Sequence, residues 1–191
     1  MNYARRLPMS SADFLEWEER QDVAWEFNGF QPIAMTGGTD AHSAIQVNLI
    51  LALGSRLRGK PCFVRGATLK VEIGSKYRYP DAFVSCTPVS PRAKITADPV
   101  VIFEILSEST AKTDRTDKVM EYTSLASVRR YVMFEQDQAF ATVISRTDTG
   151  WSIEVLGLAG SLVMPEIGIE VPISELYEGL ELTPLEEPPP A

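Results

Sequence analysis

The sequence predicts a single α+β domain, in which a central mixed sheet is flanked by helices and followed by a C-terminal antiparallel meander. Short apolar or alternating segments typical of strands recur between residues 62 and 106, and one long segment before them has helical spacing. Three more alternating segments follow one another closely, as the strands of a meander do. The predicted helices cover residues 11–21, 41–58, 117–124 and 174–178, and the predicted strands cover residues 23–27, 30–35, 62–65, 68–73, 79–85, 99–106, 129–135, 139–146 and 151–156.

The first sixty residues carry clear start and stop signals. Ser10 or Ser11 can cap the first helix by accepting a hydrogen bond from its orphan N–H groups. Asn28-Gly29 lies between two apolar segments, which is typical of a tight hairpin turn. A flexible loop at residues 36–40 precedes the long helix, and Gly59 can end that helix.

The middle of the chain alternates between strands and loops. Two strands are joined near Gly66, and the second alternates apolar with polar residues. Residues 86–98 contain prolines and are predicted to form a loop. The run from residue 99 to 106 is apolar on both faces except at Glu104, which is typical of a central strand. Polar residues 110–116 are predicted to form a turn before the next helix.

Length and composition place the domain boundaries near the chain ends. A chain of 191 residues fits one domain, which we expect to span residues 10–180 after an N-terminal extension at 1–9. Residues 162–169 are predicted to be irregular or strand-like. Residues 181–191 are rich in proline and glutamate, so we expect a disordered tail.

Charge is unevenly distributed along the chain. The formal net charge is −8, but residues 56–130 hold 14 of the 18 Lys and Arg against 8 of the 26 Asp and Glu, a local balance of +6. Such a basic segment is compatible with a local phosphate-binding face, and equally with ordinary solvated side chains.

Targeting and redox signals are sparse. No window approaches ~18 consecutive apolar residues, so no membrane-spanning helix is expected, and the N-terminus does not resemble a signal peptide. Cys62 and Cys86 have no metal-ligand spacing. We therefore expect a cytoplasmic protein in which both cysteines are reduced and serve as small apolar fillers.

Two carboxylates beside apolar segments are the best lead to function. Glu104 lies inside Val100–Leu106, and burying an unpaired carboxylate there would cost several kcal/mol. Asp81 stands at the start of another apolar segment. Carboxylates on neighbouring strands are suitable ligands for Mg²⁺ or Mn²⁺. The competing interpretations are that Asp81 is a turn residue and that Glu104 is a core residue paired with an arginine.

A longer set of motifs resembles a known family. Pro80-Asp81 followed by Phe103–Leu106 is similar to the pattern of the PD-(D/E)XK nuclease superfamily. The longer run resembles the Uma-two branch of that superfamily, a family of putative restriction endonucleases, over roughly residues 10–178. The segments that carry this resemblance are Glu26–Gly29, His42, Arg78–Asp81, Glu104–Thr110, Asp114 with Lys118 and Tyr122, Gly150-Trp151 and Pro165–Ile169.

The resemblance implies a restriction-endonuclease-like fold and a metal-dependent cleavage of DNA. In this interpretation Asp81 and Glu104 bind Mg²⁺ or Mn²⁺ with help from the Ile105 carbonyl. The resemblance also implies a homodimer. The residues expected to form the site are catalytic Asp81, Glu104 and Lys118, with Glu26, His42 and Tyr122 in support.

One position departs from the superfamily pattern. Leu106 stands where that pattern has a lysine, two residues after Glu104. The matching lysine of this branch is Lys118, on the following helix, and its long side chain can reach the same point. Tyr122 is four residues further on and shares its helix face.

Several of these residues also have plainer interpretations. Glu26 can be an exposed strand residue instead of a metal or water contact, and Lys118 can be a solvated helix residue. His42 can contact a phosphate or a metal-bound water, or simply lie in solvent at a helix start. Asp114 and Asp117 are expected to be helix caps.

A second hypothesis for the whole chain is a catalytically inactive nuclease scaffold that binds nucleic acid or assembles with partners. The two hypotheses predict different sites. An enzyme brings Asp81, Glu104 and Lys118 together at an open cleft, whereas a relic turns Lys118 away or buries Glu104 against an arginine. The chain has no glycine-rich phosphate loop, no Cys/His cluster and no G-x-S-x-G sequence, which argues against other hydrolase chemistries.

Overall fold

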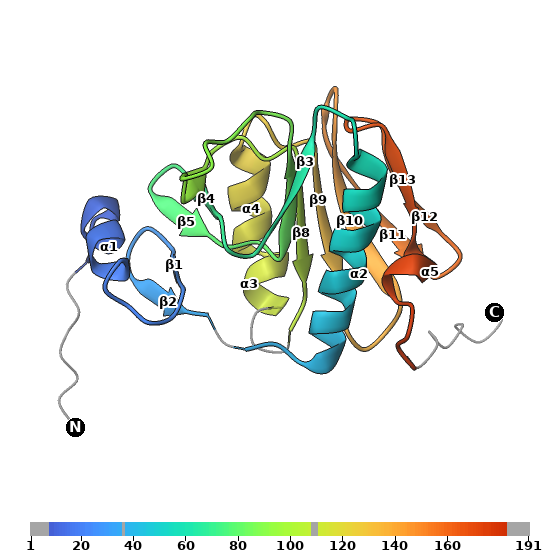
Figure 1. Ribbon diagram of the computed structural model, residues 1–191, viewed down its shortest axis with the longest axis horizontal. Coiled ribbons are helices and arrows are strands. Elements are labelled where there is room, and N and C mark those ends of the chain that lie inside the picture. The colour runs from blue at the N-terminus through green and yellow to red at the C-terminus, as the bar shows by residue number, and fades with distance from the viewer. Residues whose placement is uncertain (1–7, 36, 108–110, 183–191) are drawn as a thin grey trace.

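The computed structural model describes residues 8–35, 37–107 and 111–182. Most of the predicted N-terminal extension and of the predicted tail lies outside these residues. Figure 1 shows the described elements along the chain. The helices are α1 (Ser11–Glu18), α2 (Asp40–Leu57), α3 (Ala111–Arg115), α4 (Asp117–Ser124) and α5 (Ile173–Leu176), and the strands are β1 (Trp25–Phe27), β2 (Pro32–Ala34), β3 (Phe63–Gly66), β4 (Lys70–Ile73), β5 (Lys76–Arg78), β6 (Ala82–Ser85), β7 (Ile95–Thr96), β8 (Val101–Ile105), β9 (Arg130–Phe134), β10 (Phe140–Thr147), β11 (Gly150–Gly157), β12 (Ser161–Met164) and β13 (Ile169–Pro172).

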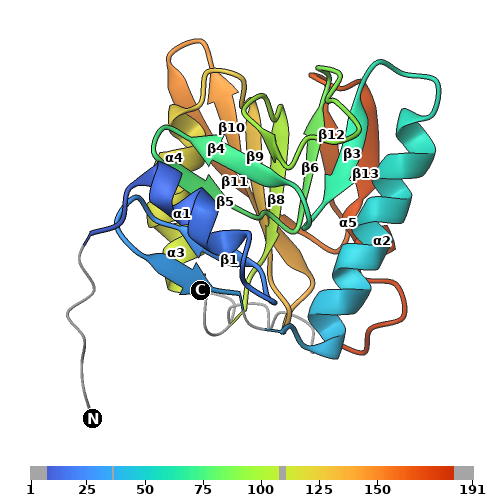
Figure 2. The same ribbon diagram turned by 60° about the vertical axis from the view of Figure 1, so that its left-hand side comes forward.

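A six-stranded mixed sheet forms the centre of the molecule, with strand order β11-β10-β9-β8-β6-β3. Strands β8 and β9 are parallel, and the other neighbours are antiparallel. Helix α2 covers one face of this sheet and α3 and α4 cover the other (Figure 2). The predicted fold class, a mixed sheet flanked by helices with an antiparallel meander in β9–β11, is therefore confirmed.

Two apolar clusters hold the layers together. On one face, Leu49 and Leu53 of α2 pack with Phe103 of β8 and with Leu162 of the β12–β13 pair. On the other face, Tyr122 of α4 packs with residues of β4, β6 and β8. Strand β4 belongs to a second sheet, with order β2-β1-β5-β4-β7, which lies against this side. The face that carries Tyr122 is also the face that carries the candidate site.

The predicted start and stop signals of the helices are confirmed. The side chain of Ser10 caps α1 by accepting a hydrogen bond from the Asp13 backbone, at 3.1 Å. Gly59 follows α2 with φ of +75°, a conformation that glycine adopts without strain. Gly29, with φ of +88°, forms the turn between β1 and β2 as expected.

Three predicted segments differ from the structure. The predicted strand at 79–85 begins only at Ala82, as β6, and β5, which ends at Arg78, was not predicted; Pro80 between the two strands has no N–H to donate to a ladder. The predicted turn at 110–116 contains α3, whose first residue, Ala111, donates its N–H to the Ser107 carbonyl at 2.8 Å. The predicted loop at 86–98 also contains the two-residue strand β7.

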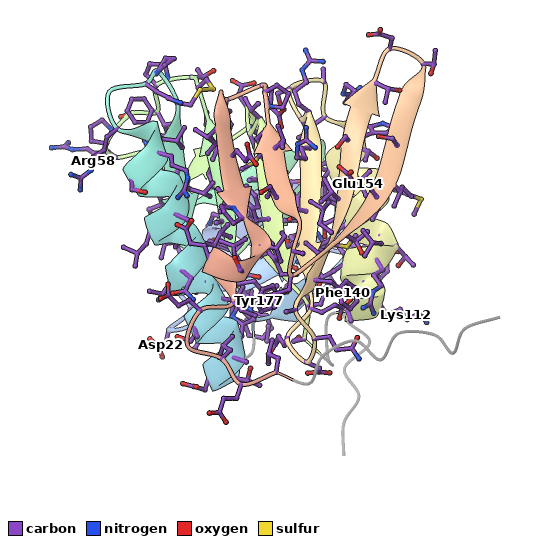
Figure 3. The ribbon with its side chains drawn as sticks, turned by 90° about the vertical axis from the view of Figure 1, so that its right-hand side faces the viewer. Asp22, Arg58, Lys112, Phe140, Glu154 and Tyr177 are labelled. Carbon is purple, nitrogen blue, oxygen red and sulfur yellow. A yellow bond between two sulfur atoms is a disulfide. The ribbon has the colours of Figure 1, made fainter. Side chains whose placement is uncertain are left out.

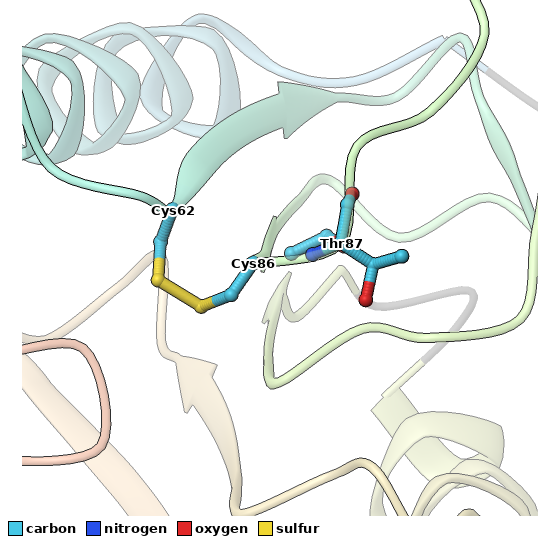
Figure 4. Close-up of a disulfide and its surroundings, with 4 residues drawn as sticks. Cys62, Cys86 and Thr87 are labelled. Atoms are coloured by element: carbon cyan, nitrogen blue, oxygen red, sulfur yellow. A yellow bond between two sulfur atoms is a disulfide. The ribbon is translucent and has the colours of Figure 1, made fainter.

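The expectation of two reduced cysteines is also wrong. Cys62 and Cys86 form a disulfide (Figure 4). Strands β3 and β6 are antiparallel with Phe63 opposite Ser85, so the next pair outward is Cys62 and Cys86. The two cysteines therefore meet because of strand pairing, and they join the edge strand β3 to the strand that follows Asp81.

The other edge of the six-stranded sheet is β11. Glu154 marks this strand in Figure 3, at the far side of the sheet from α2. Ile153 and Val155 are exposed there, at 70% and 62%. Among the described helices, none combines the length and the apolar character needed to cross a membrane.

Candidate functional site

Strand register brings Asp81 and Glu104 together. In the antiparallel pair of β6 and β8, Ala82 lies opposite Phe103, so the next pair outward is Asp81 and Glu104. The Asp81 carboxylate accepts a hydrogen bond from the Ile105 N–H at 2.7 Å. Two acids that are 23 residues apart in the sequence therefore flank the same point on the sheet.

Glu104 receives two side chains from α4. The Lys118 ammonium donates to its Oε1 at 2.9 Å, and the Tyr122 hydroxyl donates to the same oxygen at 2.8 Å. Lys118 and Tyr122 are one helical turn apart, as expected for residues on one face. Lys118 points into the site and away from solvent, so its interpretation as a solvated helix residue is wrong. The partner of Glu104 is a lysine and not an arginine.

The charges of Glu104 and Lys118 depend on burial and on each other. Burial raises the pKa of Glu104 to about 8, and the nearby Lys118 only partly opposes this shift. Burial alone would lower the pKa of Lys118, but the carboxylates of Glu104, Glu26 and Asp114 outweigh it and raise that pKa above its ordinary value. Lys118 is therefore a permanent cation near neutral pH, which suits charge stabilisation better than proton abstraction.

Three carboxylates surround the Lys118 ammonium. Its Nζ lies 2.9 Å from Glu104 Oε1, 2.9 Å from Asp114 Oδ1 and 3.4 Å from Glu26 Oε1. Asp114 lies inside α3 and is 1% exposed, so the expectation that it caps a helix is wrong. Asp117 is exposed in the first turn of α4 and follows the N-cap residue Thr116, so the expectation that it caps the helix is also wrong. The sequence did not indicate the contact of Asp114 with Lys118, because the segment around Asp114 has the composition of a polar turn.

Arg78 joins Glu26, one of the three carboxylates around Lys118, to Glu121 of α4. The guanidinium of Arg78 donates two hydrogen bonds to Glu121 of α4, at 2.7 and 2.9 Å, and one to Glu26 at 2.9 Å. Glu26 also accepts a hydrogen bond from the Tyr79 N–H. Glu26 is 9% exposed, so its interpretation as an exposed strand residue is wrong. Arg78 and Glu121 were not among the expected site residues. For Arg78, the available sequence signal was its position directly before Tyr79-Pro80-Asp81.

His42 lies in the first turn of α2 and faces Asp81. Its Nε2 is 3.2 Å from Asp81 Oδ1. The hydrogen bond to Asp81 raises the pKa of His42 above its ordinary value, although burial opposes this. Gly38 packs against the ring, because a Cβ at that position would lie 3.0 Å from His42 Cγ. Thr39 caps the helix by accepting from the His42 N–H at 3.1 Å. His42 is thus held at the site and is not a freely solvated residue.

Five of these charged or titratable residues line one cavity of about 130 Å³, namely Glu26, His42, Asp81, Glu104 and Lys118. Its reactive groups are little exposed: 14% for Asp81, 5% for Glu104 and 6% for Lys118. Of the resembling motif at 104–110, Ser107 lies in the wall, and residues 108–110 lie outside the described part of the chain. The cavity is lined by Glu26, Ile33, Ala34, Met35, Gly37, Gly38, His42, Tyr79, Asp81, Glu104, Ile105, Ser107 and Lys118.

The charge balance around this cavity fits a divalent cation. Five carboxylates form the group, namely Asp81, Glu104, Glu26, Asp114 and Glu121; three cations face them, namely Lys118, Arg78 and Lys76. Once Glu104 has lost its proton, and with His42 neutral, five negative charges against three positive ones leave a surplus of two. Within the described residues, no three His, Cys, Asp or Glu side chains are arranged to hold a metal by themselves. Asp81 and Glu104 would therefore need water and backbone oxygen to complete a shell, which is how Mg²⁺ is commonly held.

The fold and these side chains together define a nuclease-like scaffold with an acidic pair and a lysine at its centre. The sequence model of the Uma2 family, described as putative restriction endonuclease, matches residues 11–174. The chain therefore belongs to the Uma2 family, and the resemblance seen in its sequence is confirmed.

Relatives and solved structures agree with this assignment. An uncharacterized protein of Synechocystis sp. PCC 6803 is 29% identical over 176 residues, which cover 90% of this chain and 93% of that protein. A second uncharacterized protein of the same organism is 26% identical over 137 residues, covering 67% and 75%. The crystal structure of a putative nuclease belonging to DUF820 from Anabaena variabilis superposes with a TM-score of 0.76 at 19% identity, covering 89% of this chain and 98% of that one. This last likeness shows the fold.

Proposed function

We propose that the protein is a metal-dependent endonuclease that hydrolyses phosphodiester bonds of DNA. One observation carries the proposal. The carboxylates of Asp81 and Glu104 flank one point of a cavity into which the Lys118 ammonium also points, 2.9 Å from Glu104. This is the arrangement that an enzyme requires and that a relic scaffold has no reason to keep. Membership of a family of putative restriction endonucleases supports the same conclusion.

Asp81 and Glu104 would hold Mg²⁺ or Mn²⁺, with the Ile105 carbonyl as a further oxygen ligand. When bound, such an ion polarises a phosphoryl oxygen and lowers the pKa of a coordinated water. The Asp81 carboxylate is already oriented for this by the Ile105 N–H. Tyr122 orients Glu104 in the same way, by donating to Oε1 and leaving Oε2 free of that contact.

Lys118 and His42 have different roles in this proposal. Lys118 stays protonated, so it stabilises negative charge that develops on the phosphate and helps to orient the attacking water. His42 borders the cavity beside Asp81, where it can donate to a phosphate oxygen or accept a proton from water. Glu26 acts through Lys118, because its Oε1 lies 3.4 Å from the ammonium.

The inactive-scaffold alternative predicts a different site. It calls for Lys118 turned to solvent or Glu104 neutralised by an arginine. The side chain of Lys118 is 6% exposed and contacts Glu104, and Arg78 contacts Glu26 and Glu121 instead. These contacts favour the enzyme, whereas the expected open cleft is instead a small recess of about 130 Å³.

The test is cleavage of plasmid DNA and of single-stranded DNA with Mg²⁺ or Mn²⁺ by the wild-type protein and by Glu104→Gln and Lys118→Met. Loss of one catalytic group commonly reduces the rate by ~10²–10⁴-fold. The matched control is Glu175→Gln, which removes a surface partner of Arg56 far from the cavity. Full activity in Glu104→Gln would refute the assignment, and a wild-type protein that cleaves no nucleic acid would refute the proposed function.

We also propose that the protein is a homodimer, as the family resemblance implies. The free edge of the central sheet at β11 is the surface that supports this, since Ile153 and Val155 expose apolar side chains beside an unpaired strand edge. The oligomeric state is a separate question from catalysis, because every group of the proposed site comes from one chain.

A further inference from the structure

We propose that the DNA strand to be cut enters this site unpaired, and not as part of an intact duplex. This inference rests on the proposed function and adds the class of substrate. Three observations support this inference: the burial of the reactive groups, the size of the cavity and the anchoring of its outer wall.

The reactive groups lie in a recess and not on an open surface. The side chains of Asp81, Glu104 and Lys118 are between 5% and 14% exposed, and His42 is 18% exposed. Their cavity holds about 130 Å³, whereas pockets for drug-sized ligands hold roughly 300–1,000 Å³. The space suits one phosphodiester with a few waters, and it is too small for a stacked base pair.

The outer wall of the cavity is firmly attached to the body of the protein. Ile33, Ala34 and Met35, in and beside β2, form this part of the lining. Strand β1, which pairs with β2, is held by the ion pair of Glu26 with Arg78 at 2.9 Å. It is held again where Phe27 stacks on Phe14 with ring centres 4.8 Å apart. Swinging this wall aside to admit a duplex would break a buried ion pair and an aromatic cluster.

The two forms of DNA differ in their ability to reach such a recess. A duplex is stiff over ~150 base pairs, so bending a site of ~20–30 base pairs sharply enough to bring one phosphate into a recess costs about 1–6 kcal/mol. An unpaired strand can bend at a single nucleotide and insert its backbone. The aliphatic side chains of Ile33 and Met35 would then contact the sugar or the base next to the cleaved bond. The net charge of −8 also disfavours approach of the more densely charged duplex.

The test compares three DNA substrates of one sequence with Mn²⁺: a labelled single strand, a hairpin-closed duplex, and that duplex with a central unpaired bubble. We expect the single strand and the bubble to be cut at least tenfold faster than the closed duplex, with bubble cuts inside the unpaired region. Cleavage of the closed duplex at the rate of the single strand would overturn the inference.

Binding provides a readout that does not need turnover. In metal-free buffer, fluorescence anisotropy should show at least tenfold tighter binding of the single strand than of the duplex, and Ala34→Trp should weaken single-strand binding by narrowing the cavity mouth. The matched control, Val163→Trp, changes an exposed residue of β12 that does not line the cavity. Equal binding of both DNA forms, or no effect of Ala34→Trp, counts against the inference. If no substrate is cut, the proposed function fails while the binding comparison still decides the strand preference.

Discussion

Glu104 is the residue at which proton binding and metal binding compete. Burial raises its pKa to about 8, so below that pH the metal-free carboxyl keeps a proton that a cation must displace. We expect the affinity for Mn²⁺ to rise about tenfold per pH unit between pH 6 and pH 8 and then to level off. Calorimetry in buffers of different ionisation enthalpy would measure this, together with release of about one proton per ion at pH 6–7.

The raised pKa of Glu104 also affects the stability of the metal-free protein. Because the folded-state pKa of Glu104 lies above its ordinary value of 4.5, its contribution to stability is complete below pH 4.5 and is lost as the pH rises through 8. Glu104→Gln should remove this part of the pH dependence of Tm. A Mn²⁺ affinity that stays constant from pH 6 to pH 8 would contradict the assignment of Glu104 as a ligand that must lose a proton.

Asp114 and Asp117 offer a matched pair of neighbouring acids. Asp114 is buried and lies 2.9 Å from Lys118, whereas Asp117 is exposed. We expect Asp114→Asn to destabilise the fold by about 1–3 kcal/mol, since a buried charged contact is weakened while two carboxylates remain on Lys118. It should also reduce the rate of cleavage, because the Lys118 ammonium loses one of the three carboxylates that surround it. Urea unfolding of both variants would measure the difference, and an equal effect of Asp117→Asn would contradict this account.

At the scale of elements, the two hydrogen bonds from the Arg78 guanidinium to the Glu121 carboxylate set the position of α4. Glu121 lies on the helix between Lys118 and Tyr122, so a fixed Glu121 places both of those side chains on Glu104. Lysine cannot reproduce a two-pronged contact with a carboxylate. We expect Arg78→Lys to destabilise the fold by about 2–4 kcal/mol, near the lower end of the range for disrupted buried pairs.

A spectroscopic signal separates this positioning role from simple stability. In the wild-type protein, the buried Lys118 ammonium should give a protected resonance in a ¹H–¹⁵N spectrum of lysine side chains. Arg78→Lys should shift or broaden this resonance even where the protein is fully folded. Arg56→Lys, which alters a half-exposed pair with Glu175, is the matched control and should leave the resonance unchanged. An unchanged resonance in Arg78→Lys would show that α4 is positioned by other contacts.

The disulfide closes the segment of chain that carries Arg78, Tyr79 and Asp81 of the candidate site. Cys62 and Cys86 enclose β3 to β6, the stretch that contains Arg78, Tyr79 and Asp81. Closing a loop of this length contributes about 3 kcal/mol in the chain-entropy description. We expect Cys62→Ser with Cys86→Ser to lower Tm by roughly 6–12 °C, at about 2–4 °C per kcal/mol for a chain of this size. Calorimetry with and without reductant would measure this, and a wild-type Tm that reductant does not change would contradict it.

At the scale of the whole molecule, the sequence predicted what depends on local patterns and missed what depends on strand pairing. Asp81 and Glu104 were proposed because a carboxylate beside an apolar strand is anomalous, and Lys118 and Tyr122 because the motif that contains them resembles the Uma2 family. The meeting of Asp81 and Glu104 comes from the register of β6 and β8, which no local pattern specifies. The disulfide was missed for the same reason, because pairing of β3 with β6 brings Cys62 to Cys86.

The long-range ion pairs were missed for a related reason. Arg78 meets Glu26 and Glu121 only after β5, β1 and α4 have packed, at sequence separations of 52 and 43 residues. A charged residue that is buried among distant partners has the same local pattern as one in solvent. Such residues can be identified once the layers of the fold are known, and the spacing of residues along the chain does not reveal them.

The last prediction concerns how two copies of the molecule associate. Strand β11 is eight residues long, lies at the edge of the central sheet, and exposes Ile153 and Val155 on one face. A two-fold antiparallel pairing of β11 with its copy would join the two sheets through main-chain hydrogen bonds and would place these side chains of the two chains side by side on one face. Charge on an edge strand opposes such pairing. Ile153→Lys should therefore shift a dimer to a monomer in light scattering, and Met120→Lys, an exposed residue of α4, should not.

Because each cavity is built from a single chain, the monomeric Ile153→Lys variant should cut an unpaired strand at the wild-type rate per site. A variant that stays dimeric would show that β11 is not the interface. A monomer that has lost single-strand cleavage would instead show that association shapes the cavity, which none of the contacts around Asp81, Glu104 and Lys118 requires.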